Sequence, residues 1–445
     1  MDQLTIDTIR ALSIDMIQKA NSGHPGTPLG TAPLAYTLWN RVLTYDPAAP
    51  RWPGRDRYVL SAGHASALLY SLIHLAGVMD GDQPALTMAD LQAFRQIGSK
   101  CPGHPEYGHT VGVETTTGPL GQGLANAVGM AIAQRWLQAH YARPNAEGGS
   151  FDLFDYRVYA QAGDGCLMEG VASEAASIAG HLRLSNLCWI YDSNRITIEG
   201  HTDLTFTEDV AQRFVSYGWN VTSVPDVNDL DAVQRALHDF EKEDERPTLI
   251  IVHSHIGYGS PVEDSPKAHG EALGVEGVKE TKARLGLPDR DFYASEEAYA
   301  TFAAGIGARG RAAHEAWQRA FDAYRAQYPE LAAEIDDIVN GALPVGWDAR
   351  LPVFETSDKG LATREAGGKV INAIAESVPW LFGGSADLAP STKTHLTCTG
   401  VFGPGDPDGR NVHFGVREFA TAAICNGLAV SGLRAFWSGF LIFSD

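Results

Sequence analysis

Short continuous apolar runs alternate along this chain with longer stretches of helical apolar spacing, a pattern typical of parallel α/β folds. The clearest example lies between Arg157 and Gly200. Residues 157–162 predict a strand, residues 169–182 a helix and residues 186–191 a second, buried strand. The two strands of such a βαβ unit are parallel, so they end at the same edge of the sheet.

The pattern recurs on both sides of this unit. It predicts further strands at 57–61, from 220, and at 248–253, with helices near 1–20, 32–42, 66–75, 124–141, 229–243 and 296–341. A second α/β pattern has a helix at 362–377, strands at 381–384 and 412–416, an Ala-rich helix to 431 and an apolar run at 436–443. We predict one domain at 1–325, a linker at 326–350 and a second domain at 351–445.

Composition and charge narrow the possible partners. Of the 445 residues, 44% are hydrophobic and 20% charged, which is ordinary for a globular protein. The formal net charge of −20 argues against nucleic acid and anionic membranes as partners. An anionic substrate would therefore need a local basic pocket.

The cysteines and the N-terminus indicate a cytoplasmic protein. The five cysteines are odd in number and lack CxxC spacing, which favours reduced thiols over disulfides or zinc. The first 20 residues have amphipathic helical spacing with acidic residues, unlike a signal peptide. No apolar run approaches the length of a membrane span.

Two polar residues at the strand ends of the central unit predict a metal site. Asp164 follows the first strand between Gly163 and Gly165, and Asn194 follows the second. A carboxylate, an amide oxygen and a backbone carbonyl after Asn194 are hard donors that suit Mg²⁺ or Ca²⁺, with diphosphate oxygens completing the shell. The glycines allow the backbone to approach the phosphates, towards which the following helix points its amides.

Three histidines lie in segments framed by proline or glycine. His24 is in Ser22-Gly23-His24-Pro25-Gly26, and we expect it on a loop before the helix near 32–42. His64 follows the strand at 57–61, at the functional rim of an open sheet. His104 is in Cys101-Pro102-Gly103-His104-Pro105-Glu106. Taken alone, the loop at His24 favours a turn with an incidental histidine over a functional site.

With its distant Asn194, the Gly163-Asp164-Gly165 motif resembles the diphosphate-binding motif of thiamine diphosphate enzymes, and the flanking sequence resembles the transketolase family. The loops around His24 and His104 and the Gly-rich Thr117–Gly123 segment agree. The resemblance covers essentially the whole chain. It implies a thiamine diphosphate-binding α/β fold, in which a parallel sheet is flanked by helices, followed by the start of a second, similar α/β domain that binds the pyrimidine.

The resemblance also implies roles for residues of the first domain. The metal, Mg²⁺ or Ca²⁺, is held by Asp164, Asn194 and the main-chain oxygen of Ile196. Thiamine diphosphate is contacted by His64, Gly118, Leu120, Gly165, Glu169, Asn194, Ile198 and His269. The substrate is met by His24, His104 and His269, and these three with His64 serve as catalytic hydrogen-bond donors and proton shuttles. Glu169 and Glu174 join the two active sites of a dimer.

In the second domain the residue of most interest is Glu418, at a strand-to-helix junction. It resembles the family glutamate that hydrogen-bonds N1′ of the pyrimidine, so that the cofactor's amino group can take the C2 proton. Phe440 and Phe443 match aromatics that hold the pyrimidine, and Asp387 matches a further cofactor contact. Arg364 and Ser391 match contacts to the substrate phosphate. Phe419 stands where many relatives have a histidine.

The activity implied is reversible transfer of a two-carbon ketol group from a ketose phosphate, such as xylulose 5-phosphate, to an aldose phosphate, such as ribose 5-phosphate, through the thiamine diphosphate ylide in the pentose phosphate pathway. A homodimer with active sites at the subunit interface is expected. The sequence stops directly after an apolar run, inside the pyrimidine domain, so we expect a truncated chain. Two alternatives are 1-deoxyxylulose-5-phosphate synthase and a non-catalytic cofactor-binding subunit that needs a second chain.

Overall fold

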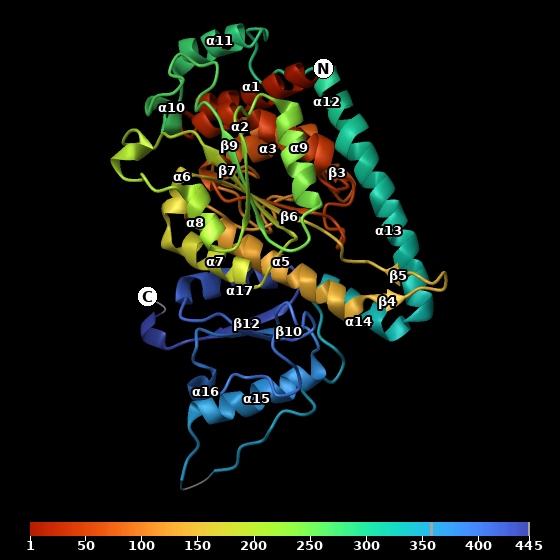
Figure 1. Ribbon diagram of the computed structural model, residues 1–445. Coiled ribbons are helices and arrows are strands. Elements are labelled where there is room, and N and C mark those ends of the chain that lie inside the picture. The colour runs from red at the N-terminus through yellow and green to blue at the C-terminus, as the bar shows by residue number, and fades with distance from the viewer. Residues whose placement is uncertain (357–358, 444–445) are drawn as a thin grey trace. The chain divides into compact units, whose positions relative to one another are not determined.

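The computed structural model describes residues 1–356 and 359–443 (Figure 1). The chain forms two compact units. The first consists of Met1–Leu124, Tyr156–Ser173 and Ser185–Ala316, and the second of Ala125–Asp155, Glu174–Leu184 and the chain from Trp317 onward. These units are not contiguous in sequence, so the domain boundaries predicted from the sequence stay a prediction.

A five-stranded parallel sheet forms the centre of the first unit. Its strands are β1 (Arg57–Leu60), β6 (Val158–Gly163), β7 (Leu187–Ser193), β8 (Asn220–Val224) and β9 (Thr248–His253), in the order β1-β6-β7-β9-β8. β1, β6 and β7 are buried over almost their whole length, as expected for strands with helices on both faces.

Helices of the first unit cover this sheet and complete its core (Figure 1). They are α1 (Asp2–Ala20), α2 (Gly26–Thr37) with a π-helical end at Leu38–Val42, a 3₁₀ turn at Gly63–Ala65, α3 (Ser66–Leu75), α4 (Met88–Gln92), α6 (Asp164–Met168), a 3₁₀ turn at Thr202–Leu204, α8 (Val210–Ser216), α9 (Leu230–Glu241), α10 (Lys267–Gly270), α11 (Gly274–Arg284) and α12 (Glu296–Phe302) with a π-helical turn at Ala303–Gly307. A short hairpin pairs β2 (Met79–Asp80) with β3 (Gln83–Pro84). Three helices, α5 (Gln122–Tyr141), α7 (Gly170–His181) and α13 (Ala308–Gln327), have residues in both units.

The second unit contains a smaller parallel sheet in the order β11-β10-β12. Its strands are β10 (Leu381–Ser385), β11 (Asn411–His413) and β12 (Arg434–Ser438); its helices are α14 (Pro329–Asn340), α15 (Thr363–Ser377), α16 (Ala389–Thr392) and α17 (Glu418–Val430), with a 3₁₀ turn at Leu441–Phe443 and a hairpin of β4 (Arg143–Pro144) and β5 (Ser150–Phe151). The predicted fold class, a helix-flanked parallel sheet followed by a second α/β domain, is confirmed.

The pairing of β6 with β7 brings the ends of the central unit together. Gly163 of β6 is the register partner of Asp192 of β7. Asp164 and Asn194 therefore leave the sheet at the same edge from neighbouring strands, as the βαβ pattern predicts.

Helix α2 begins earlier than the sequence pattern predicts. The helix was expected near 32–42 but starts at Gly26, so only the residues up to Pro25 form the loop at His24. Pro28 lies in the first turn, where the helix does not need its missing N–H. Gly30 gives room for close packing, because a Cβ there would meet the main-chain oxygen of His255 at 2.8 Å.

Three other predicted elements are corrected by the structure. Asp164 and Gly165, which were expected only to follow the strand, begin the short helix α6. β11 ends at His413, because Gly415 turns the chain with a φ of 67°. β12 ends at Ser438, so Phe440 and Phe443 lie outside the strand.

Two further expectations concern the chain end and membrane-spanning segments. The chain end at Ser444 and Asp445 lies outside the described residues. Within the described residues, no helix has the length and apolar character needed to cross a membrane.

Candidate functional site

Asp164 presents an oxygen without a partner at the edge of the large sheet. It follows β6 and is 5% exposed. The hydroxyl of Tyr191, in β7, donates to its Oδ1, while Oδ2 is buried with no hydrogen-bond partner. Burial raises the pKa of Asp164 to about 6, although the Tyr191 hydrogen bond opposes the shift. A bound cation would satisfy this oxygen and stabilise the carboxylate.

Asn194 is held in one orientation by its neighbours. Its Nδ2 donates to Asp192 Oδ2 at 2.8 Å, and its Oδ1 accepts from the backbone N–H of Ile196 at 3.0 Å. Oδ1 has a second lone pair, and the turn keeps the main chain of Ile196 close to the amide. The three predicted metal ligands therefore come from two neighbouring strand ends, and their metal-binding role stays a prediction.

Asp192 is a site residue that the sequence analysis did not single out. Its side chain is buried at 1% exposure, and its Oδ1 accepts a hydrogen bond from the hydroxyl of Ser254. Burial, together with the nearby charge of Asp164, raises the pKa of Asp192 to about 7. Its position at the end of a buried strand, two residues before Asn194, was the available signal.

Three of the predicted histidines meet from distant parts of the first unit. The ring centroids of His24 and His64 are 5.1 Å apart, those of His64 and His269 5.2 Å, and those of His24 and His269 5.9 Å. The Nδ1 atoms of His24 and His269 are buried without a partner. These nitrogens are available to hydrogen-bond a ligand.

The histidine cluster (His24, His64, His269) is kept neutral by its surroundings. Burial lowers the pKa of His24 to about 4, and positive charge on His269 or Arg95 would lower it further. Burial also holds the pKa of His64 well below its usual value and lowers that of His269. Neutral imidazoles can both donate and accept hydrogen bonds, which suits contact with sugar hydroxyls.

His104 lies beside this cluster and next to a cation. A Cβ added to Gly118 would lie 3.4 Å from the His104 ring, an ordinary van der Waals distance, so the two loops adjoin. Burial, and then the charge of Arg95, lower the pKa of His104. Arg95 and His104 line a surface hollow of about 440 Å³, and the sequence analysis had not singled out Arg95.

Glycines of the first unit provide close backbone approaches. A Cβ at Gly165 would meet Leu120 Cδ1 at 2.7 Å, and one at Gly63 would meet Thr117 Oγ1 at 2.6 Å. Gly118 also has a φ of 150°, which other residues rarely adopt. The packing brings Gly165 and Leu120 together, as a cofactor contact shared by both would require.

Two predicted cofactor contacts in the first unit are exposed. The side chain of Ile198 is 68% exposed, which is unusual for isoleucine and available to an apolar ligand surface. Glu169 is also exposed and lies just before α7.

In the second unit, Glu418 begins helix α17. Glu174 caps the same helix: its Oε2 accepts from the backbone N–H of Ala420 at 2.9 Å. Arg417, just before the helix, donates to Ser177 Oγ at 3.0 Å. Within one chain, these contacts place Glu174 at the helix end that carries Glu418.

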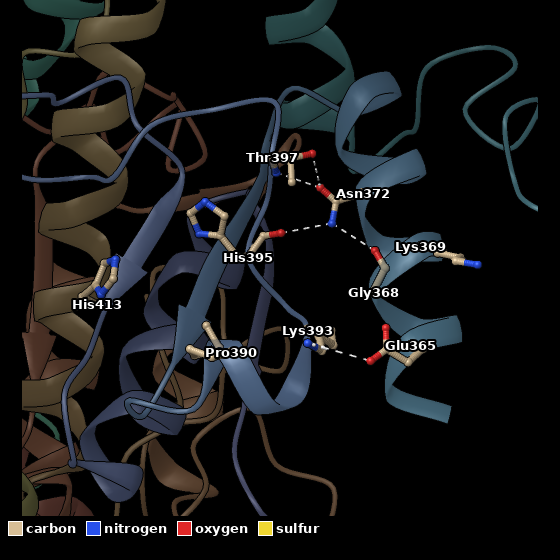
Figure 2. Close-up of a pocket in the computed structure, with 10 residues that line it drawn as sticks. Glu365, Gly368, Lys369, Asn372, Pro390, Lys393, His395, Thr397 and His413 are labelled. Atoms are coloured by element: carbon tan, nitrogen blue, oxygen red, sulfur yellow. Dashed lines mark hydrogen bonds and ion pairs between the residues drawn. The ribbon is translucent and has the colours of Figure 1, made fainter. Parts of the chain in front are cut away.

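The predicted phosphate contacts Arg364 and Ser391 are exposed and lie on different helices, α15 and α16. Their neighbours Glu365 and Pro390 line an open hollow of about 640 Å³, shown in Figure 2. Lys393 pairs with Glu365 at 3.8 Å, whereas Lys369 points away from the other labelled side chains. Arg364 and Ser391 are not among the lining residues.

The remaining predicted cofactor contacts of the second unit lie near the chain end and directly after β10. Phe440 and Phe443 are 47% and 49% exposed, with ring centroids 6.2 Å apart. Asp387, after β10, is exposed and has a φ of 62°. This left-handed conformation is uncommon for residues other than glycine, although aspartate adopts it more readily than most.

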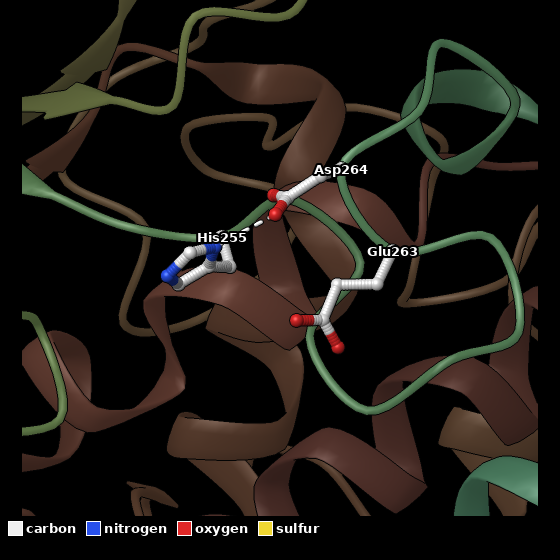
Figure 3. A group of neighbouring side chains, drawn as sticks. All are labelled: His255, Glu263 and Asp264. Atoms are coloured by element: carbon white, nitrogen blue, oxygen red, sulfur yellow. Dashed lines mark hydrogen bonds and ion pairs between the residues drawn. The ribbon is translucent and has the colours of Figure 1, made fainter.

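Figure 3 shows another group of potential metal ligands, His255, Glu263 and Asp264, on the first unit's surface. Asp264 Oδ2 accepts from His255 Nδ1 at 2.8 Å, and Glu263 Oε2 accepts from the Gly259 N–H at 2.6 Å. These hydrogen bonds already account for the group as a loop closure, so we assign it no ligand.

Fold and site together define an α/β protein whose strand ends, at the carboxyl edge of a parallel sheet, carry oxygen donors suited to a divalent cation and a diphosphate. The unpartnered oxygen of Asp164 and the close backbone packing at the glycines fit a cation with a bound diphosphate. A family model described as "Transketolase, thiamine diphosphate binding domain" matches residues 1–344, and one described as "Transketolase, pyrimidine binding domain" matches residues 359–445. The chain belongs to the transketolase family, and thiamine diphosphate as its cofactor is confirmed.

Relatives and solved structures agree. Transketolases from Geobacillus stearothermophilus and Bacillus subtilis are 52% and 47% identical over the whole chain. A transketolase from Pichia stipitis in complex with sedoheptulose 7-phosphate has a TM-score of 0.94 at 42% identity over 99% of the chain, and that from Leishmania mexicana has 0.93 at 41% over 100%. The chain spans 65% of the length of each of these proteins.

Proposed function

We propose that this chain provides the cofactor-binding part of a transketolase, which transfers a two-carbon ketol group from a ketose phosphate to an aldose phosphate. The observation that carries the proposal is the meeting of Asp164 and Asn194 at neighbouring strand ends, with one buried Asp164 oxygen unpartnered. The names of the relatives favour this activity over 1-deoxyxylulose-5-phosphate synthase.

Asp164, Asn194 and the main-chain oxygen of Ile196 would hold Mg²⁺ or Ca²⁺, which binds the cofactor diphosphate. Gly165, Gly118 and Leu120 would contact the cofactor, and the exposed side chain of Ile198 offers it an apolar contact. Bound thiamine diphosphate supplies the carbon nucleophile that accepts and releases the two-carbon unit.

The histidines would act on the sugar. Because burial keeps His24, His64 and His269 neutral, each ring can donate a proton from one nitrogen and accept at the other. His104 would extend this set at the edge of the hollow that it shares with Arg95. Arg364 and Ser391 would contact the substrate phosphate, Arg364 as a fixed fork of donors.

Glu418 would hold a proton at the pyrimidine ring nitrogen, and Phe440 and Phe443 would pack against the ring. Asp387 and Glu169 would make further cofactor contacts. The exposed positions of Phe440 and Phe443 support a binding role, since large aromatic side chains are usually buried.

We also propose a homodimer with active sites at the subunit interface. The second unit exposes apolar side chains around Glu418 and the chain end, a terminal apolar cluster made of Val416, Phe419, Phe440, Leu441, Ile442 and Phe443. Each is at least 47% exposed. Apolar exposure on this scale is typical of interaction surfaces.

Two further expectations, the domain bounds and the location, belong to the same proposal. The family-model limits, 1–344 and 359–445, support domains at 1–325 and 351–445 joined by a linker. All five cysteines are free and four are buried, which supports a cytoplasmic location.

The test is a coupled assay of the 445-residue chain with xylulose 5-phosphate and ribose 5-phosphate, with and without thiamine diphosphate and Mg²⁺. We expect turnover that requires both additions. Turnover of pyruvate with glyceraldehyde 3-phosphate instead would reassign the activity. Calorimetric binding of the cofactor without any turnover would indicate a cofactor-binding subunit that needs a second chain.

A further inference from the structure

Asp192 is a buried carboxylate whose two hydrogen-bond donors are neutral. The hydroxyl of Ser254 donates to Oδ1, and the amide of Asn194 donates to Oδ2 at 2.8 Å. With 1% of the side chain exposed, water does little to stabilise this charge. Neither hydrogen bond compensates it with an opposite charge.

The Asp192–Asn194 hydrogen bond decides which way the Asn194 amide faces. A carboxylate only accepts, so Nδ2 must lie on the Asp192 side and Oδ1 on the opposite side. The backbone N–H of Ile196 donates to Oδ1 and reinforces this choice. The reversed amide would present a donor where a cation needs an oxygen.

Asp192 is itself fixed by the packing of three elements. It lies in β7 beside β9, with Val252 as its register partner, and Ser254 follows β9 directly. Helix α2 lies behind Ser254, because a Cβ at Gly30 would come within 3.4 Å of Ser254 Oγ. The carboxylate therefore has little freedom to move.

We propose that Asp192 is a positioning residue, which fixes the amide oxygen of Asn194 for a divalent cation and places a negative charge behind that ligand. This inference rests on the proposed cofactor site. Groups that orient metal ligands in this way commonly change metal affinity by about 10- to 100-fold when they are mutated.

The test compares Asp192→Asn with the wild-type chain by calorimetric titration of Mg²⁺ in the presence of thiamine diphosphate. We expect the variant to bind Mg²⁺ about 10- to 100-fold more weakly. Without cation or cofactor, we expect its thermal midpoint to equal or exceed that of the wild type, because an uncompensated buried charge has been removed. A merely structural role would instead lower that midpoint and leave the Mg²⁺ affinity unchanged.

Two further variants make the test specific. Asp56→Asn is the matched control. Asp56 is a buried carboxylate of the same unit, and it accepts hydrogen bonds from the backbone N–H groups of Thr44 and Arg157 instead of from Asn194. The Asp56→Asn variant should therefore bind Mg²⁺ as tightly as the wild type does. Ser254→Ala removes one donor to Asp192 and should give an intermediate loss of affinity. It also serves if Asp192→Asn fails to fold.

A double-mutant cycle tests whether Asp192 acts through Asn194. In an Asn194→Ala background, Asp192→Asn should cost less Mg²⁺ affinity than in the wild type. If the two losses of affinity are fully additive, or if Asp192→Asn alone leaves the Mg²⁺ affinity unchanged, the inference is overturned. The proposed site still stands in that case, provided that the wild type binds Mg²⁺. If the wild type binds no Mg²⁺ with thiamine diphosphate, the proposed site fails and this inference fails with it.

Discussion

At the scale of single residues, the histidine cluster shows how burial tunes chemistry. His24, His64 and His269 come from segments up to 245 positions apart in the sequence, and each ring lies within 6 Å of the other two. Placing protonated imidazoles so close together would be costly. Burial and mutual repulsion therefore favour neutral rings, which are suited to exchanging protons with hydroxyl groups.

The lowered pKa of His24 predicts a pH-dependent loss of stability. A histidine in the unfolded chain titrates near 6.5, whereas His24 in the folded chain titrates near 4. Between these values the unfolded state binds more protons than the folded state. The stability that neutral His24 contributes is therefore fully present above pH 6.5 and is lost as the pH falls towards 4. On going from pH 7.5 to pH 5, the wild type should lose about 1 kcal/mol more than His24→Gln, allowing for partial exposure.

Urea denaturation of both proteins at the two pH values measures this difference. The other histidines are present in both proteins, so the difference reports the titration of His24 together with its repulsion of His64. Equal losses of stability in the two proteins would contradict a depressed His24 pKa.

Glu418 gives a second prediction at this scale. Glu418→Gln removes the exchangeable carboxyl proton but keeps the size of the side chain. We expect exchange of the cofactor C2 proton, followed by NMR in deuterated water, to slow by at least about 100-fold. The control is Glu365→Gln, which changes a glutamate of the same unit on α15 and should leave the exchange rate unchanged. Normal exchange in Glu418→Gln would count against the proposed role.

At the scale of elements, the helix that carries Glu418 is held by close backbone packing. Gly427 of α17 lies against α5, since a Cβ there would meet the Asn126 main-chain oxygen at 1.9 Å and the Gly129 Cα at 2.9 Å. With the Glu174 cap at its first turn, this contact fixes the start of α17. Gly427 and Gly129 therefore matter for the position of Glu418, although Gly129 is remote from it in sequence.

Gly427→Ala should consequently destabilise the protein by about 1–3 kcal/mol or more, because backbone atoms cannot move aside as a flexible side chain can. Gly367→Ala is a matched control in helix α15: nothing lies within 4 Å of its Cβ, and alanine favours the helix. Thermal unfolding followed by circular dichroism should show a lower midpoint for the first variant only. Equal midpoints would mean that α5 and α17 are not closely packed.

At the scale of the whole molecule, a buried ion pair joins distant parts of the first unit. Lys282 of α11 and Asp15 of α1 lie 2.6 Å apart and are 2% and 1% exposed. Asp15 also accepts from the Phe292 N–H at 2.7 Å. Such a pair contributes little net stability when it is intact, but it is costly to break.

Lys282→Met should therefore destabilise the protein by about 3–5 kcal/mol, by leaving Asp15 buried without a counter-charge. Adding Asp15→Asn should recover most of this loss, because the amide oxygen can still accept from Phe292. As a control, Lys242→Met removes an ion pair with Asp239 that is more than 70% exposed, and should change stability by less than about 1 kcal/mol. Denaturant titration distinguishes these outcomes, and a mild effect of Lys282→Met alone would contradict them.

The proposed homodimer gives the last prediction. Ile442, in the terminal apolar cluster, is 76% exposed, whereas Val353 is 84% exposed in the same unit but outside that cluster. If the cluster is an interface, Ile442→Asp should weaken self-association by at least about tenfold, while Val353→Asp should not. Sedimentation equilibrium measures both. Equal association constants would place the interface elsewhere.

Local patterns in the sequence were sufficient for the order of strands and helices, whereas the roles of most candidate site residues were implied by the family resemblance. Apolar spacing and Gly/Pro punctuation are local properties, so Asp164, Asn194 and Glu418 could be placed at strand or helix ends before any packing was known. The same locality explains the errors. Whether Gly26 starts a helix, or the run to Phe443 continues as a strand, depends on neighbouring segments.

Tertiary structure alone decided what surrounds those residues. The register of β6 with β7 brings Asp164 near Asp192, and the end of β9 brings Ser254 to Asp192. His24 meets His269 because α2 packs against the segment at Ala268, where a Cβ on Gly26 would meet the Ala268 main-chain oxygen at 2.5 Å. Burial, pKa shifts and orphaned polar atoms arise only when distant segments exclude water together, and no local sequence pattern contains that information.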